Sequence, residues 1–398
     1  NIYKLKTINH HLKNTLKNVD SDSYLVGRAW VPGEHSGPCV IWIKNNNAFD
    51  LTHQFPTTTS LFETRDPIQE LNKIKNLKSI GEVEKIIQNT PIEERNQKNP
   101  WVLSPCDLQA IKASGVTFVS SMLERVIEEK ARGNWNQAQE IRSNLKKLIG
   151  DNLSDIVPGS KAALKVKDIL IKQKLWSQYL EVGIGLDAEI FTKSQPMSSV
   201  GNGFDIGILK NSNWNNPEPE IVLVVNSKNK IIGVTLGNDV NLRDYEGRSA
   251  LLLGKAKDNN ASCSLGPFIR LFDEKFKLED IKNAKINITI NGLDGFHHED
   301  NYFMNKISRD PEDLVNQCSN DNHNYPDGFL LYLGTMFTPV MDRDEVGKGF
   351  THKIGDIVSI QTEKVGKLTN RVNYSHLCEP WIFGTSALIK NLSSRRQI

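Results

Sequence analysis

Short runs of apolar and β-branched residues, separated by polar turns, dominate the chain and predict a structure rich in β-strands. Near the start, the runs Tyr24 to Val26 and Val40 to Ile43 alternate with the turn clusters Pro32-Gly33 and Lys44 to Asn47. This alternation, from residue 22 to about residue 65, predicts a small β-rich unit at the beginning of the chain.

Two stretches carry apolar residues at helical spacing instead. Ile68 to Gln88 predicts an amphipathic helix, and Val116 to Arg132 predicts a second one. Between them, the polar, proline-containing segment Asn89 to Pro100 is typical of a linker. We therefore expect a small N-terminal domain over residues 1–99 and a larger domain over residues 100–398.

The clearest pair of strands lies near the middle of the chain. Glu220 to Val225 and Lys230 to Leu236 are apolar, β-branched runs, and the polar residues Asn226 to Asn229 separate them. This arrangement predicts an antiparallel hairpin. A turn centred near Lys228 would place Glu220 opposite Leu236.

Three carboxylates meet at the open end of this hairpin. Glu218 and Glu220 are two residues apart, so their side chains leave the same face of a strand. In the same register Glu218 lies opposite Asn238, and therefore beside Asp239. Like charges this close need a cation, and an all-oxygen ligand set suits Mg²⁺, Mn²⁺ or Ca²⁺ rather than zinc. The alternative is a solvated acidic strand end without a metal.

Composition and charge narrow the classes of function. The chain has 398 residues, enough to bury a sizeable core, and a net charge of +2, which implies no nucleic-acid partner. No apolar run approaches the ~18 residues of a bilayer span, and the first residues contain no apolar signal core. A cytoplasmic protein without a membrane partner is therefore expected. The five cysteines are widely spaced and indicate reduced thiols rather than disulfides or a zinc site.

From Trp101 onward, a series of ordered motifs resembles the fumarylacetoacetate hydrolase superfamily. Members carry an E-x-E pair, then a G-N-D-V-x-x-R-D segment, then a lysine nine residues before a Gly-Pro. Here these are Glu218-Pro219-Glu220, Gly237 to Asp244, and Lys257 before Gly266-Pro267. Further matches are Phe191-Thr192-Lys193, Ser198 to Gly201, Gly334-Thr335, Phe350 to Val358 and Gly366 to Asn370.

This resemblance implies an architecture and a cofactor. The implied fold is α+β but mostly β, with a small β-rich N-terminal domain and a rolled mixed β-sheet catalytic domain. A lid and helical insert are expected at about residues 107–178. The implied cofactor is Mg²⁺ (or Mn²⁺ or Ca²⁺) on Glu218, Glu220 and Asp239, and the implied assembly is a homodimer.

The lid stretch separates two branches of the superfamily. Many hydrolases and decarboxylases have G-x-N-Y-x-x-H-x-x-E there, and its His and Glu activate a water. The stretch Gly115 to Glu124 has Ser121 at the histidine position and Glu124 at the glutamate position. A serine without a neighbouring base cannot take up a proton near pH 7. The sequence G-V-T-F, followed by a serine and Arg125, instead resembles the sugar-acid dehydratase branch.

The resemblance to that branch assigns the candidate roles. The expected catalytic residues are Lys257, Glu124 and Glu189. The expected substrate-binding residues are Ser121, Arg125, Arg243 and Thr335. The alternatives are an ion pair between Glu189 and Lys193, and a solvated helix face for Glu124 and Arg125.

These expectations converge on an enzyme of sugar-acid catabolism. A divalent ion on three carboxylates leaves positions open for a 2-oxo acid, and such chelation acidifies C3. Loss of hydroxide from C4 of the metal-stabilised enolate would make the protein a dehydratase of a 2-keto-3-deoxy sugar acid. Carbon–carbon cleavage after attack by water would make it a hydrolase of fumarylacetoacetate or acylpyruvate type. A non-catalytic binding protein is the third possibility.

Overall fold

One long, mixed β-sheet forms the body of the protein. The computed structural model describes the chain except for residues 1–7, 132–134, 150–154 and 338. The strand order is β4-β3-β2-β1-β13-β11-β10-β16-β6-β7, with β5 paired to β1. Its strands are β1 (Leu25–Val31), β2 (Gly37–Lys44), β3 (Asn47–Asp50), β4 (Lys78–Glu82), β5 (Trp101–Leu103), β6 (Ala110–Gly115), β7 (Glu189–Ser194), β10 (Pro219–Val225), β11 (Ile231–Asp239), β13 (Cys263–Leu271) and β16 (Phe329–Tyr332).

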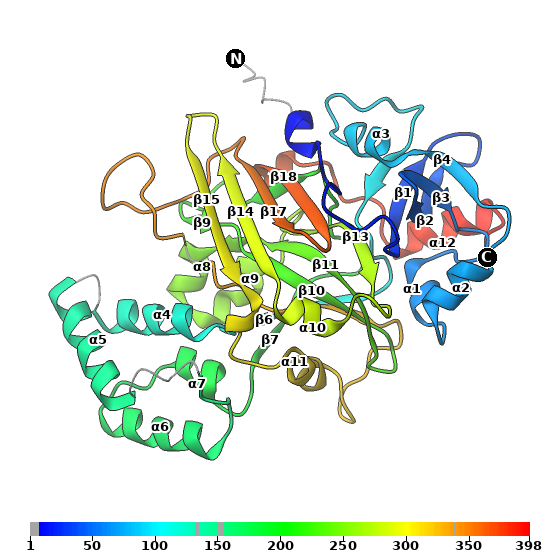
Figure 1. Ribbon diagram of the computed structural model, residues 1–398. Coiled ribbons are helices and arrows are strands. Elements are labelled where there is room, and N and C mark those ends of the chain that lie inside the picture. The colour runs from blue at the N-terminus through cyan, green and yellow to red at the C-terminus, as the bar shows by residue number, and fades with distance from the viewer. Residues whose placement is uncertain (1–7, 132–134, 150–154, 338) are drawn as a thin grey trace.

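A second sheet packs across the middle of the first one (Figure 1). In spatial order it contains β15 (His297–Phe303), β14 (Lys285–Asn291), β17 (Ile357–Thr362), β18 (Gly366–Tyr374) and β8 (Asp205–Ile208). The short strands β9 (Asn215–Asn216) and β12 (Asn241–Leu242) form a separate pair. Each large sheet contains one parallel pair, β16 with β6 and β18 with β8, so both are mixed.

Strand β10 is buried on both faces. Leu223 belongs to the apolar cluster between the two sheets, together with Ile288 and Val358. Val222 and Val224 point to the opposite face, into a cluster that includes Trp42. A strand covered on both sides needs a continuous apolar run rather than alternation, which explains the sequence of this segment.

A helical lobe projects from one end of the large sheet, at the lower left of Figure 1. It consists of α4 (Val119–Ala131), α5 (Trp135–Ile149), α6 (Lys161–Lys172) and α7 (Gln178–Ile184). The lobe has an apolar cluster of its own, which includes Met122, Val126 and Leu180. Since Ala110–Gly115 is strand β6 of the large sheet, the lobe begins at Val119, later than the predicted insert.

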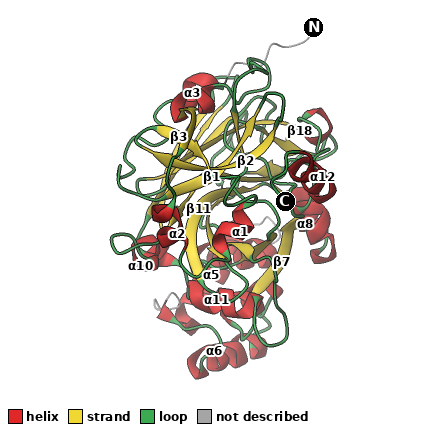
Figure 2. Cartoon of the chain, turned by 90° about the vertical axis from the view of Figure 1, so that its right-hand side faces the viewer, coloured by secondary structure: helices red, strands yellow, loops and turns green. Residues whose placement is uncertain are grey.

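The remaining helices cover the edges and faces of the sheets. They are α1 (Thr58–Phe62), α2 (Pro67–Lys73), α3 (Val83–Gln88), α8 (Arg243–Arg248), α9 (Leu253–Lys257), α10 (Leu278–Lys282), α11 (Pro311–Cys318) and α12 (Thr385–Ser394). Figure 2 shows α3 and α6 at opposite ends of the molecule. None of the helices in the described part of the chain is both long enough and apolar enough to cross a bilayer.

The N-terminal strands continue the large sheet, because β1 pairs with β13. The domain boundary near residue 99 stays a prediction. The single helix predicted for Ile68 to Gln88 is wrong: α2 ends at Lys73, and Lys78–Glu82 is strand β4, which pairs with β3. Pairing with the neighbouring strand outweighs the helical spacing of the apolar residues there.

Candidate active site

Three carboxylates converge at the open end of the β10–β11 hairpin, as the sequence predicts. Glu218 directly precedes β10, Glu220 lies within it, and Asp239 ends β11. Each side chain is buried and offers an oxygen that lies within 4.8 Å of those of the other two. The amide of Asp239 donates to the carbonyl of Glu218 at 2.9 Å, which fixes the two backbones side by side.

The predicted register of this hairpin is off by one residue. Next to the turn, Val225 pairs with Ile231, as expected, but a bulge then shifts the ladder, so that Glu220 pairs with Gly237 rather than Leu236. Pro219, and not Glu218, lies opposite Asn238. Gly237 is required there because a Cβ would lie 2.3 Å from Cε1 of Tyr332.

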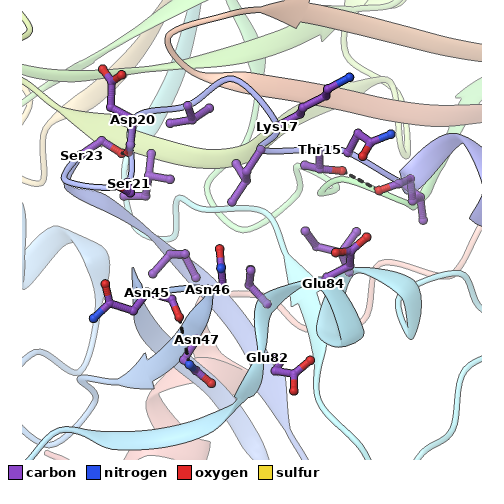
Figure 3. A pocket seen from close by; sticks show the side chains of 18 residues that line it. Thr15, Lys17, Asp20, Ser21, Ser23, Asn45, Asn46, Asn47, Glu82 and Glu84 are labelled. Carbon is purple, nitrogen blue, oxygen red and sulfur yellow. Dashed lines mark hydrogen bonds between the residues drawn. The ribbon is translucent and has the colours of Figure 1, made fainter.

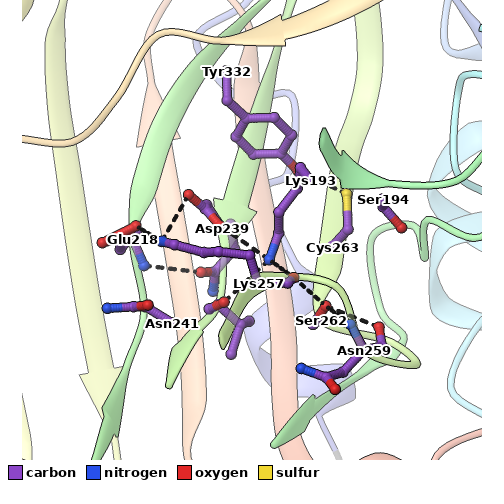
Figure 4. Close-up of polar contacts among 12 residues, drawn as sticks. Lys193, Ser194, Glu218, Asp239, Asn241, Lys257, Asn259, Ser262, Cys263 and Tyr332 are labelled. Carbon is purple, nitrogen blue, oxygen red and sulfur yellow. Dashed lines mark hydrogen bonds and ion pairs between the residues drawn. The ribbon is translucent and has the colours of Figure 1, made fainter. Parts of the chain in front are cut away.

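Two buried lysines face the carboxylates (Figure 4). Nζ of Lys257, from the end of α9, lies 2.6 Å from Oε1 of Glu218 and 3.2 Å from Oδ2 of Asp239. Nζ of Lys193, from β7, lies 3.0 Å from Oδ1 of Asp239. Lys193 also donates to the carbonyls of Val240 and Lys257, so it is held rigidly.

The charges of this cluster do not balance. Burial and the neighbouring carboxylates of Asp239 and Glu218 raise the pKa of Glu220 well above its usual value. Burial alone would raise the pKa of Asp239, but Lys257 and Lys193 hold it below the usual range. Burial alone would lower the pKa of Lys257, but Asp239 and Glu218 raise it. Three carboxylates against two ammonium groups leave one negative charge, so the donor set fits a divalent cation.

The carboxylates line a small, partly enclosed cavity of about 20 Å³, roughly the room of one water. Most of its polar lining residues come from the sheet and the segments that follow its strands, whereas Val116 and Met122, at the start of the helical lobe, are apolar. Its lining residues are Ser114, Gly115, Val116, Met122, Glu189, Phe191, Glu218, Glu220, Asp239, Glu246, Lys257 and Thr335.

Some of the other predicted site residues gather here and some do not. Glu189, Lys257 and Thr335 line the cavity. Arg243 is absent from its lining, and its guanidinium stacks 4.2 Å from the centre of the Trp214 ring. Ser121, Glu124 and Arg125 fall within α4, but their side chains lie outside the described part of the structure. The roles of these four residues stay predictions.

Sequence reasoning missed three residues of the site. The motif Phe191-Thr192-Lys193 and a possible ion pair with Glu189 are the only sequence signals for Lys193, which lies at a bulge of β7 that local spacing does not predict. Glu246 lines the cavity and accepts a hydrogen bond from Asn241 at 2.8 Å. Tyr302, from the second sheet, donates to the carbonyl of Pro219 at 2.5 Å, and no local signal marks it.

A larger cavity of about 820 Å³ lies between Leu12–Leu25, the turn at Asn45–Asn47 and Glu82–Ile87 (Figure 3). It shares no lining residue with the carboxylate cavity. Among the described residues, only Glu218, Glu220 and Asp239 form a group of three or more side chains arranged to hold a metal. The carboxylate cavity is therefore the candidate active site.

Similarity to known proteins agrees with this site. Residues 191–373 match the fumarylacetoacetate hydrolase C-terminal family. A protein of Saccharolobus solfataricus described as 2-dehydro-3-deoxy-D-arabinonate dehydratase is 33% identical over 194 residues, 49% of this chain and 61% of that protein. A probable 2-keto-3-deoxyxylonate dehydratase of Haloferax volcanii is 30% identical over 184 residues, 46% of this chain and 60% of that protein.

A solved structure shares the fold. It is that of 2-keto-3-deoxy-D-arabinonate dehydratase complexed with magnesium and 2,5-dioxopentanoate, with a TM-score of 0.58 and 22% identity over 88% of this chain and 99% of that one. The α+β, mostly β fold class is therefore confirmed. The matches to the two curated relatives span only about three fifths of the length of those proteins. The family match over residues 191–373 confirms the resemblance that the sequence motifs indicate.

Proposed function

We propose that this protein is a divalent-metal-dependent lyase that dehydrates a 2-keto-3-deoxy sugar acid. The observation that carries the proposal is the buried cluster of Glu218, Glu220 and Asp239, with Lys257 against it. Two relatives are described as dehydratases of such acids, and a protein of the same fold binds magnesium. Burying charges costs stability, so a cluster of this kind is hard to explain in a non-catalytic binding protein.

The three carboxylates would hold Mg²⁺, or Mn²⁺ or Ca²⁺, through oxygen ligands. When bound, the ion supplies Lewis acidity toward the oxygens of a 2-oxo acid. Gly334 donates its amide to Oε2 of Glu220 at 2.7 Å, which directs the other oxygen of this carboxylate to the shared centre. The neighbouring Thr335 is then placed beside the ligand set, where it can bind the substrate.

The remaining residues divide the proton transfers. Because its neighbours raise the pKa of Lys257, this side chain is a cation at neutral pH, suited to stabilise negative charge. Glu189 is the carboxylate we assign to removal of the C3 proton. Its side chain reaches the cavity beside Gly115, where a Cβ would lie 2.5 Å from Oε2 of Glu189. The hydroxyl at C4 then leaves with a proton supplied by an acid, for which Glu124 is the candidate.

The second candidate function is hydrolysis of a carbon–carbon bond. It requires a base that activates water, a role for which imidazole is suited near neutral pH. None of the described residues that line the cavity is a histidine. This favours dehydration, which needs no activated water.

Metal binding gives the first prediction. Mg²⁺ should stabilise the wild-type protein by ~2.7 kcal/mol when its free concentration is about 100 times its dissociation constant. Glu220→Gln should abolish this increment because it removes one of the three carboxylate ligands, and it should not destabilise the metal-free protein because it relieves the repulsion from Asp239 and Glu218. Thermal unfolding with and without Mg²⁺ measures both effects. Glu274→Gln, at an exposed position, is the control, and an equal Mg²⁺ increment in Glu220→Gln would refute the ligand assignment.

The role of Lys257 gives the second prediction. Lys257→Met should reduce turnover by ~10² or more, because it removes a buried positive charge at the reacting centre. Lys255→Met is the matched control in the same helix, since its ammonium lies over the ring of Tyr245 instead. Steady-state kinetics on both variants decide the matter. Equal losses of turnover in the two variants would show that Lys257 has no specific catalytic role.

The choice of reaction is tested with a substrate panel. With Mg²⁺ present, 2-keto-3-deoxy sugar acids should be dehydrated and acylpyruvates should not be cleaved, with the two products assayed separately. Ser121→His asks whether an imidazole at the lid position introduces cleavage. Efficient cleavage of acylpyruvates by the wild-type protein, with no dehydration of any sugar acid, would show that the lyase proposal is wrong.

We also propose a cytoplasmic homodimer, on the strength of the family resemblance. Light scattering at micromolar concentration should then give twice the chain mass of 44.9 kDa. A mass equal to that of one chain would rule the dimer out.

A further inference from the structure

The candidate active site is too small for its proposed substrate as it stands. The free space of about 20 Å³ holds roughly one water, so a five-carbon acid requires part of the wall to move aside. Glu220, Asp239 and Glu189 belong to strands of the large sheet. Val116 precedes α4 and Met122 lies in its first turn, outside the sheet. These two residues are therefore the part of the wall that can move aside.

Val116 has an unusual backbone conformation. Its φ is +55°, a left-handed conformation that is rare for a β-branched residue and is often found at functional sites. The neighbouring Thr117 fixes this turn: its hydroxyl donates to the carbonyl of Leu333 at 2.7 Å, and its own carbonyl accepts two hydrogen bonds of 2.7 Å from Ser308. Gly334 completes the fit, since a Cβ there would lie 2.1 Å from Oγ1 of Thr117. The turn is thus held in the conformation that places Val116 in the cavity wall.

Helix α7 supports this wall from behind. A Cβ on Gly183 would lie 2.0 Å from Sδ of Met122 and 3.5 Å from Cγ1 of Val116, so the helix backbone packs directly against both side chains. The end of α7 is anchored in turn by the buried Arg309, which donates to the carbonyls of Val182 at 2.7 Å and Gly185 at 2.9 Å. The helical lobe therefore determines how far Val116 and Met122 can retreat.

We propose that Val116 and Met122, backed by Gly183, are specificity-determining residues that limit the chain length of the 2-oxo acid. This inference rests on the proposed function and deepens it. The oxo-acid end of the substrate meets the carboxylates, Lys257 and Thr335, so its far end extends toward Val116 and Met122, and their position limits its length. The lobe between β6 and β7 selects the substrate by size, while the strands and α9 supply the chemistry.

The test is a ladder of straight-chain 2-oxo acids, lengthened from pyruvate by one carbon at a time. Their affinities for the Mg²⁺-loaded protein are measured by calorimetry, which requires no turnover. Val116→Ala and Val116→Gly should each extend the longest acid bound by at least one carbon, with a change of ~10-fold or more per methylene at the limit. The melting temperature of Val116→Gly should be higher than that of Val116→Ala, because glycine adopts a positive φ without strain.

Gly183→Ala should act in the opposite direction. Alanine is favourable within a helix, but its methyl group displaces Met122 toward the cavity, so the longest acid bound should become shorter. Val126→Ala is the control, because Val126 is buried in the same lobe without lining the cavity. It should lower stability and leave the ladder unchanged.

The outcomes separate the two levels of the argument. If the wild-type protein binds 2-oxo acids and neither Val116 variant changes the ladder, or Val126→Ala changes it equally, the wall does not set specificity and the proposed function stands. If the Mg²⁺-loaded wild-type protein binds no 2-oxo acid of any length, both the proposed function and this inference are overturned.

Discussion

The repulsion between three buried carboxylates is the constraint on which the rest of the structure depends. Glu218, Glu220 and Asp239 have at most 5% of their surface exposed, so water cannot screen their charges. Two buried lysines, from β7 and α9, reduce this repulsion by forming ion pairs with the carboxylates. Against three carboxylates, the two lysines leave one negative charge uncompensated. This charge favours the binding of a cation.

The two sheets share the task of holding this cluster in place. The hairpin sets the spacing of the carboxylates, but its open end would be free to splay without support from outside. Tyr302 supplies that support from the second sheet through its bond to the carbonyl of Pro219, the residue between the two glutamates. The amide of Gly334, which follows the neighbouring strand β16, orients Glu220. The packing of the two sheets against each other therefore also helps to position the three carboxylates.

The sequence reveals the parts of this site that are close together along the chain. The two glutamates and Asp239 were found because one hairpin carries them, and a two-residue period is readable without a structure. The register failed by one residue because a bulge depends on how β11 also pairs with β13, which the hairpin sequence does not contain. Lys193, Glu246 and Tyr302 come from three separate segments. They lie close together only because these segments pack against one another. The periodicity of the sequence does not predict that packing. The helix predicted from Ile68 failed for the same reason, since strand β4 exists only through its partner β3.

The charged and the apolar lining residues of the cavity lie in different parts of the fold, so substitutions can change one set without the other. The three carboxylates of the charged side lie in or beside strands β10 and β11, which are buried on both faces, so substitutions there disturb the core. The apolar side is encoded by the stretch from Val116 to Met122 and by α7, which belong to a lobe with its own apolar cluster. The resemblance to the superfamily places the water-activating His and Glu of its hydrolases in this same stretch. If the proposed function holds, changes in this one segment could alter both the size of the substrate and the reaction, while the strands that carry the three carboxylates remain as they are.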